Sequence, residues 1–116
     1  MGISRARLLA AAALVLPAAC TTPSAPNGAL RLSNYNFDQA YVQVVATSGY
    51  CEPHAPGVVG VDAFPLPFNA SRFMRPPAGV DICWRRALDP VHPRLSQWSP
   101  WSRAYLVPGA IIDSRL

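Results

Sequence analysis

The chain has 116 residues, of which 51% are hydrophobic and 14% charged, so it is long enough for one small domain with a modest core. All ten basic residues are arginines, and from residue 20 onward eight arginines stand against six acids, a balance of about +2. These charges are spread along the chain and form no basic stripe, so nucleic acid is not an expected partner.

The first element in chain order is a short export signal. It reads MGISRARLLAAAALVLPAAC, with Arg5 and Arg7 ahead of an uncharged apolar run over residues 8–16 and small residues after it. This order of parts is typical of a secretory signal peptide. Because a membrane-spanning helix needs roughly 20 apolar residues, the run is too short to cross a bilayer on its own. We therefore predict a helical signal segment, cleaved from the mature protein, over residues 1–19.

The end of this signal resembles the lipobox of bacterial lipoproteins, in which an aliphatic residue and two small residues precede a cysteine. Ala18, Ala19 and Cys20 match the pattern, while Pro17 stands where leucine is usual. The resemblance implies that Cys20 receives a diacylglyceryl thioether and becomes the acylated first residue after cleavage. A triacylated cysteine, carrying chains such as palmitate, is a stable anchor. Thr21 is not the aspartate that retains lipoproteins in the inner membrane, so the resemblance implies the outer membrane, with the domain facing the periplasm.

Lipidation of Cys20 would leave one pair among the three cysteines, Cys51 and Cys83. An odd cysteine in an exported protein needs an explanation, and the lipid supplies one. We expect the remaining two to form a disulfide bond, which the oxidising compartment outside the cytoplasm permits. A plain cleaved signal, leaving Cys20 free or bridged to another chain, is the alternative.

The mature protein is expected to begin with the lipidated cysteine and a flexible, proline-containing tether over residues 20–28. A single domain follows over residues 29–116. Its short segments alternate apolar and polar residues with a period of two, and prolines interrupt the chain too often for a helix. The strands that we predict cover residues 29–33, 41–47, 57–64, 71–75, 79–85, 103–107 and 110–116.

About seven short strands at spacings near ten residues predict an all-β fold, a small antiparallel β-sandwich or barrel. The first two strands, separated by the turn-like NYNFDQ, are expected to form a hairpin. In the third strand Val59, Val61 and Ala63 share one side. Between the last two strands, Pro108 and Gly109 suit the central positions of a type II turn.

Metal binding and catalysis are the alternatives to a non-enzymatic role. Cys51, Glu52 and His54 lie close together in CEPH. His92 or Cys83 could complete four zinc ligands. The spacing is not that of two ligand doublets, so a disulfide with surface histidines is favoured and no metal or other cofactor is expected. The chain has no Gly-x-Ser-x-Gly elbow, His-Glu-x-x-His motif or phosphate-binding glycine loop, so we expect no catalytic residues and no enzyme.

The most unusual stretch is QWSPWSR, residues 97–103. Trp98, Ser99, Trp101 and Ser102 resemble the Trp-Ser-x-Trp-Ser pattern of thrombospondin type 1 repeats and of class I cytokine receptors. In the receptors the pattern lies just before the last strand of a fibronectin-type sandwich, and arginines interleave with the rings. The resemblance implies a ladder of indoles and guanidinium groups in this chain.

Arg85, Arg86 and Arg103 are the arginines expected in this ladder. Trp84 adds a third indole. A guanidinium over an indole gains about 0.5–2 kcal/mol, so the ladder is first of all a packing device. The alternative is that the exposed indoles and the three arginines form a binding surface, because aromatic residues and arginine are favoured at interfaces.

We therefore predict a lipid-anchored protein of the bacterial cell envelope with a binding or structural role and no catalytic activity. Its partners would be the membrane, through the lipid anchor, and another envelope protein or a glycan. Two alternatives stay open, namely a small periplasmic metalloprotein or hydrolase, and a lipoprotein subunit of a larger envelope assembly.

Overall fold

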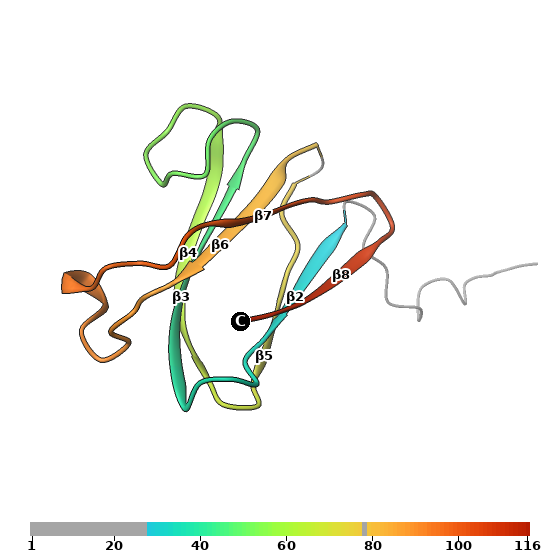
Figure 1. Ribbon diagram of the computed structural model, residues 1–116. Coiled ribbons are helices and arrows are strands. Elements are labelled where there is room, and N and C mark those ends of the chain that lie inside the picture. The colour runs from blue at the N-terminus through green and yellow to red at the C-terminus, as the bar shows by residue number, and fades with distance from the viewer. Residues whose placement is uncertain (1–27, 78) are drawn as a thin grey trace, which may run out of the picture.

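The computed structural model describes residues 28–77 and 79–116, which form seven β-strands and one turn of 3-10 helix (Figure 1). The predicted signal peptide, Cys20 and nearly all of the tether lie outside the described residues. The all-β prediction is confirmed, and each predicted strand has a counterpart within a few residues. The elements in chain order are β2 (Ala29–Ser33), β3 (Gln39–Thr47), β4 (Val58–Pro67), β5 (Ser71–Met74), β6 (Asp81–Arg86), η1 (Pro93–Leu95), β7 (Ser102–Tyr105) and β8 (Ile111–Arg115).

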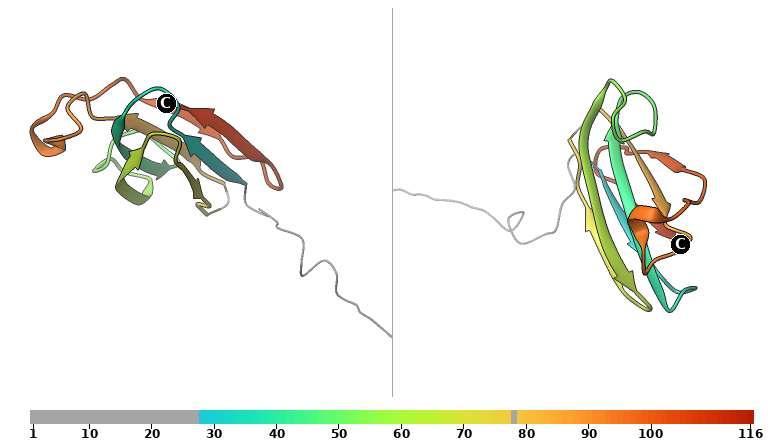
Figure 2. Two further views of the ribbon diagram at one scale, coloured as in Figure 1. Left: turned by 90° about the horizontal axis from the view of Figure 1, so that it is seen from below. Right: turned by 90° about the vertical axis from the view of Figure 1, so that its left-hand side faces the viewer.

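The strands form two sheets that pack face to face as a sandwich (Figures 1 and 2). The larger sheet has the strand order β4-β3-β6-β7, and the smaller sheet has the order β5-β2-β8. Neighbouring strands are antiparallel except for β2 and β8, which run parallel. The expectation of an antiparallel sandwich therefore holds for every pair but that one.

The predicted hairpin between the first two strands is wrong, because β2 and β3 belong to different sheets. The segment between them crosses from one sheet to the other, and its first residue, Asn34, is fully buried. Nδ2 of Asn34 donates to the carbonyl oxygens of Phe37 and Leu66. Its Oδ1 accepts from the backbone N–H groups of Asn36 and Phe37. Because a buried amide needs all of these partners, the contacts hold the crossing in place.

The core lies between the two sheets and is built from alternate residues of the strands. In β4 the side shared by Val59, Val61 and Ala63 faces solvent, whereas Phe64 and Leu66 on the other side enter the core. Burying these two larger side chains removes more apolar area from water, which decides the face. The fully formed core contains Leu30, Leu32, Ala40, Val42, Val44, Phe64, Leu66, Ile82, Trp84 and Leu106.

Pro108 and Gly109 form the predicted type II turn. Gly109 has a φ of 79°, a left-handed value that glycine adopts without strain. The N–H of Ala110 donates to the carbonyl oxygen of Val107 at 3.1 Å and closes the turn. The turn does not close a hairpin, because it leads from β7 in the larger sheet to β8 in the smaller one.

The predicted disulfide bond joins Cys51 and Cys83, whose Cα atoms are 5.8 Å apart. Cys51 lies in the connection between β3 and β4, and Cys83 lies on β6 opposite Val45 of β3. Val45 and Thr47 are fully buried although they sit on the outer side of β3. The bond therefore ties the connection down over this part of the larger sheet.

Removing the disulfide is expected to lower the free energy of unfolding by about 3–4 kcal/mol. The bond closes a loop over a sequence separation of 32 residues and thereby restricts the conformations of the unfolded chain. The double variant Cys51→Ala/Cys83→Ala is compared with the wild type by urea-induced unfolding. Dithiothreitol serves as the control, since it should destabilise the wild type and leave the double variant unchanged. A double variant as stable as the wild type would contradict this expectation.

Candidate functional site

The WSPWS segment continues the pairing of β6 and β7 toward one end of the larger sheet. Ala87 and Trp98 form an isolated antiparallel bridge. Ser99 is fixed twice, because its N–H donates to the carbonyl oxygen of Arg86 and its Oγ accepts from the N–H of Arg86. These contacts hold Trp98 just ahead of β7, the last strand of the larger sheet in chain order.

The guanidinium of Arg85 lies between the two indoles, 4.8 Å from the ring centre of Trp98 and 4.2 Å from that of Trp101. Its Nε donates to Oε1 of Gln43 at 2.9 Å. Burial lowers the pKa of Arg85 from its ordinary value, and the negative charge of Glu52 partly opposes this change. Both tryptophans are half-buried. The stack therefore packs the outer face of the larger sheet, with about 0.5–2 kcal/mol for each guanidinium–ring contact.

The other two arginines expected in this ladder lie elsewhere. Arg86 is on the inner side of β6, with its guanidinium 4.1 Å from the ring centre of Phe37. Arg103 is on β7, where its Nε donates to Oδ2 of Asp81 at 2.5 Å. Trp84 belongs to the core between the sheets and not to the ladder. Alternation along β6 explains why Trp84 and Arg86 lie on the other side of the sheet from Arg85, since adjacent residues of a strand point to opposite faces.

A groove of about 190 Å³ lies beside the ladder on the outer face of the larger sheet. Tyr41 and Trp98 meet in it edge to face, with ring centres 6.5 Å apart and planes at 61°. Such a volume is below the usual range for pockets that enclose a whole small molecule, so it suits one side chain or one sugar ring of a larger partner. The lining residues are Tyr41, Gln43, Ala63, Pro93, Arg94 and Trp98.

The groove contains hydrogen-bond donors that the protein does not use internally. Oε1 of Gln43 accepts from Arg85, which leaves the amide nitrogen of Gln43 available as a donor. The guanidinium of Arg94 forms no ion pair among the described residues. Two aromatic rings and two sets of N–H donors therefore converge on one hollow, a combination that recognises a partner with an apolar part and an acceptor group.

Tyr41 and Gln43 are not among the site residues predicted from the sequence. The signal that locates them is the alternation of residues 41–47. Because Val42 and Val44 point into the core, Tyr41 and Gln43 must point outward from the same strand. The approach of residues 93–98 to this face has no comparable local signal.

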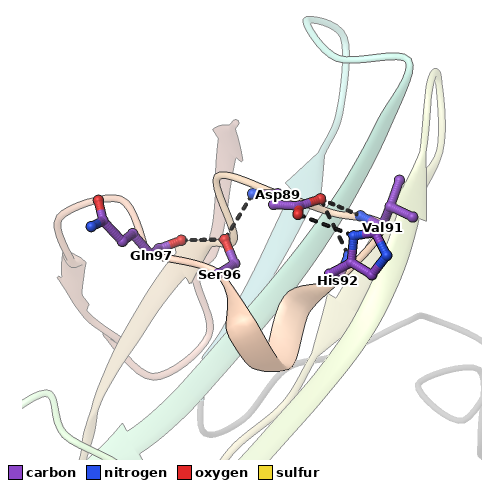
Figure 3. Close-up of polar contacts among 5 residues, drawn as sticks. All are labelled: Asp89, Val91, His92, Ser96 and Gln97. Carbon is purple, nitrogen blue, oxygen red and sulfur yellow. Dashed lines mark hydrogen bonds and ion pairs between the residues drawn. The ribbon is translucent and has the colours of Figure 1, made fainter.

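One wall of the groove is the connection between β6 and β7, which Asp89 braces (Figure 3). Oδ1 of Asp89 accepts from the backbone N–H groups of Val91 and His92, at 3.1 and 3.2 Å. Its Oδ2 lies 3.2 Å from Nδ1 of His92, and its own N–H donates to Oγ of Ser96. Lost solvation raises the pKa of Asp89, but the hydrogen bonds from His92 and Val91 outweigh it and hold the pKa below its ordinary value.

This braced connection projects from the sandwich and exposes three apolar side chains (Figure 1). The exposed fractions are 50% for Leu88, 68% for Val91 and 87% for Leu95. Apolar side chains gathered on an ordered, projecting segment are typical of a contact surface. They lie on the same connection as Pro93 and Arg94, which line the groove.

The structure does not bring together the residues considered for a metal site. Cys51 and Cys83 are joined to each other, and His92 is hydrogen-bonded to Asp89. His54 is exposed in the connection between β3 and β4. Among the described residues, no group of three or more potential metal ligands is close enough to hold an ion.

No protein-family model matches the chain, and neither the curated proteins nor the solved structures contain a match. In the part of the chain that the structure describes, no helix has the length and apolar character to span a membrane. The function proposed below therefore rests on the residues of this chain alone.

The order of the β6–β7 connection is expected to depend on pH through Asp89. Because the pKa of Asp89 in the folded loop lies below the ordinary value of 3.8, its stabilisation is complete above that value and is lost as the pH falls through the lower folded pKa. Backbone amide chemical shifts of Val91 and His92, followed by NMR during an acid titration, measure the transition. Asp89→Asn should shift these amides already at neutral pH, whereas Asp38→Asn, a change at an exposed acid outside this loop, should not. Equal effects of the two variants would refute the bracing role of Asp89.

Proposed function

We propose that this protein is a lipid-anchored, non-enzymatic binding protein of the bacterial cell envelope. In this proposal the signal peptide directs export, Cys20 carries the lipid that fixes the chain to the outer membrane, and the sandwich faces the periplasm. There the domain binds another envelope protein or a glycan. The role requires no metal or other cofactor.

The disulfide bond supports the exported location. Two of the three cysteines, Cys51 and Cys83, are joined, and disulfides persist in oxidising compartments such as the periplasm. The pairing leaves Cys20 as the only other cysteine of the chain, at the position where the lipobox pattern places the lipid. The cysteine pairing and the N-terminal signal therefore favour the same location, outside the cytoplasm.

The groove beside Trp98 is the single observation that carries the binding role. Its rings are held by the Tyr41–Trp98 contact and by the stack on Arg85, and its wall is braced by Asp89. A binding surface whose side chains are already fixed loses little conformational entropy when a partner docks. The N–H donors of Gln43 can form hydrogen bonds that orient the partner, and the aromatic rings provide apolar contact area.

The groove lies at the end of the domain away from the tether. Gly28, where the described chain begins, lies against Leu106 and Val107 beyond the end of β7, whereas Trp98 precedes the start of β7. Figure 2 shows the β6–β7 connection projecting at the end opposite to the first residue of β2. The tether therefore joins the domain at the end opposite to the groove, so a lipid anchor would leave the groove uncovered.

The acids of the domain favour binding over catalysis. Four of its six carboxylates contact an arginine or a histidine, and the other two, Asp38 and Glu52, lie beyond opposite ends of β3, so they do not form the close pair that general acid–base chemistry at a glycan or ester would need. The four contacts join Asp62 to Arg72, Asp81 to Arg103, Asp89 to His92 and Asp113 to Arg31.

Cys20→Ser is expected to abolish lipid attachment. Cells grown with radioactive palmitate should label the wild-type protein and not the Cys20→Ser variant, which should leave the membrane fraction. The double variant Cys51→Ala/Cys83→Ala keeps Cys20 and is the matched control, which should still be labelled. A Cys20→Ser protein that remains membrane-bound would count against the anchor.

A photo-crosslinking amino acid at position 95, next to Arg94 of the groove lining, should capture the partner in intact cells. The matched control places the same group at position 107, because Leu95 and Val107 are both exposed but lie at opposite ends of the domain. We expect a discrete adduct from position 95 and none from position 107. The yield of this adduct should fall severalfold in the Tyr41→Ala variant, which removes one of the two aromatic rings of the groove. Mass spectrometry of the adduct distinguishes a protein from a glycan. Identical adducts from both positions, or none, would speak against the groove.

A further inference from the structure

The outer face of the smaller sheet carries an ordered grid of arginine and aromatic side chains. These residues face away from the core because Leu30 and Leu32, which alternate with them on β2, are buried inside it. The grid lies on the opposite side of the sandwich from the Trp98 groove. Its two rows across β5, β2 and β8 are Phe73, Arg31 and Asp113 and, one step along the strands, Ser71, Ser33 and Arg115.

The first row contains one neutralised arginine and one exposed ring. Nε and Nη2 of Arg31 donate to the two carboxylate oxygens of Asp113, at 2.5 and 2.6 Å. The hydrogen bond from Arg31 holds the pKa of Asp113 below its ordinary value. Arg31 and Arg75 also lie over the ring of Phe73, at 5.7 and 5.2 Å from its centre, and 43% of Phe73 remains exposed.

Two arginines of this face have no acidic partner. Neither Arg75 nor Arg115 takes part in an ion pair among the described residues. Arg115 lies 5.4 Å from the ring centre of Tyr35, which is 47% exposed. A guanidinium that lies over a ring keeps its N–H groups at the edge, where they can meet a carboxylate as a two-pronged fork. The Arg31–Asp113 pair already shows this geometry on the same face.

The second row borders a hollow of about 360 Å³. Oγ of Ser33 is 2.7 Å from Oγ of Ser71, so the two hydroxyl groups are hydrogen-bonded to one another. Tyr35 and Arg115 are therefore the groups that this hollow offers to a ligand. Its complete lining is Arg31, Ser33, Tyr35, Asp113, Ser114 and Arg115.

We propose that this face binds an acidic polysaccharide. Arg115 and Arg75 take two of its carboxylate groups, and Tyr35 and Phe73 pack against the apolar faces of its sugar rings. The charge of the face matches this ligand, because the two unpaired cations add to a neutral Arg31–Asp113 pair. The site goes beyond the binding role of the Trp98 groove, since it lies on the other sheet and names its own ligand.

The distance between the two free arginines points to a polymer. Arg75 follows the end of β5 and Arg115 ends β8, so they are separated by two inter-strand spacings across the sheet and about four residues along it. Standard sheet spacings make this about 16 Å between their Cα atoms. A single small anion cannot reach both guanidinium groups, whereas a chain of charged sugars can.

An acidic polysaccharide fits better than a nucleic acid. Nucleic-acid binding draws its affinity from many phosphate contacts, roughly 6–10 in well-studied cases. This face offers two arginines without an ion pair among the described residues, beside an Arg31–Asp113 pair of no net charge, so it supplies too few cations for a nucleic-acid backbone. A sugar polymer with separated carboxylates places fewer charges against the same surface.

The test titrates the full-length protein, purified in mild detergent, with hexagalacturonate and follows binding by calorimetry. We expect saturable binding that weakens about tenfold in Arg115→Gln and in Arg75→Gln, since each loses one charge-assisted contact. Neither arginine's side chain makes a hydrogen bond among the described residues, so each variant loses only an exposed guanidinium–ring contact and should melt within a few degrees of the wild type. Arg103→Gln is the matched control, because it removes the same charge from the other sheet, outside the Trp98 groove, and should change the affinity by less than about twofold.

The opposite outcomes are equally definite. Absent saturation, or an equal loss in Arg103→Gln, would overturn the site. Maltohexaose bound as tightly as hexagalacturonate would remove the role of charge, and a DNA oligothymidylate bound more tightly would assign the face to nucleic acid. None of these results depends on the acyl label at Cys20 or on crosslinks from position 95, so failure of this site and failure of the proposed function are separable.

Discussion

The crossing at Asn34 is the constraint on which the arrangement of the strands depends. Its side chain makes four hydrogen bonds to backbone groups, three in its own connection and one at Leu66 on β4. The backbone N–H of Asn34 donates to Ala70 and its carbonyl oxygen accepts from Asn69. These bonds join the β2–β3 connection to the β4–β5 connection. Removing the amide would leave these buried groups without either protein or water. The contacts of Asn34 thereby fix where the chain changes sheets and place β5 beside β2.

Strand positions follow from local alternation, but the crossing does not. Asparagine favours turns because its side chain bonds nearby backbone groups, and the bonds of Asn34 to Asn36 and Phe37 are of this kind. Its bond to Leu66 spans 32 residues, and no local pattern announces it. The local sequence therefore does not distinguish a hairpin turn from a connection that crosses between the two sheets. The same limit applies to the β2–β8 pairing, which joins the two ends of the domain in a parallel register that no turn dictates.

The residues of the candidate site likewise fall into two groups, those that the local sequence identifies and those that only the tertiary structure brings in. Trp98, Trp101 and Arg85 could be named from the sequence, because their residue types and spacing define the stack. Alternation along β6 is enough to place Arg86 on the other face. Tyr41 becomes part of the site for another reason, because the β6–β7 connection folds back over β3 and brings Trp98 against it. That approach depends on the length and bracing of the connection, which are tertiary properties.

Arginine stacked on aromatic rings is the recurrent contact of this lysine-free chain. A guanidinium can lie flat on a ring and still donate sideways, which a compact ammonium group cannot do. Where the group is half-buried and its N–H is taken by Gln43, as in Arg85, the contact packs the sheet. Where it forms no ion pair within the described part of the chain, as in Arg115 over Tyr35, the same contact leaves a positive charge on the surface that a ligand can meet. Burial and the presence of a partner within the protein thus distinguish the arginines that stabilise the fold from those that are available to bind a ligand. The six stacked arginines are Arg31, Arg72, Arg75, Arg85, Arg86 and Arg115.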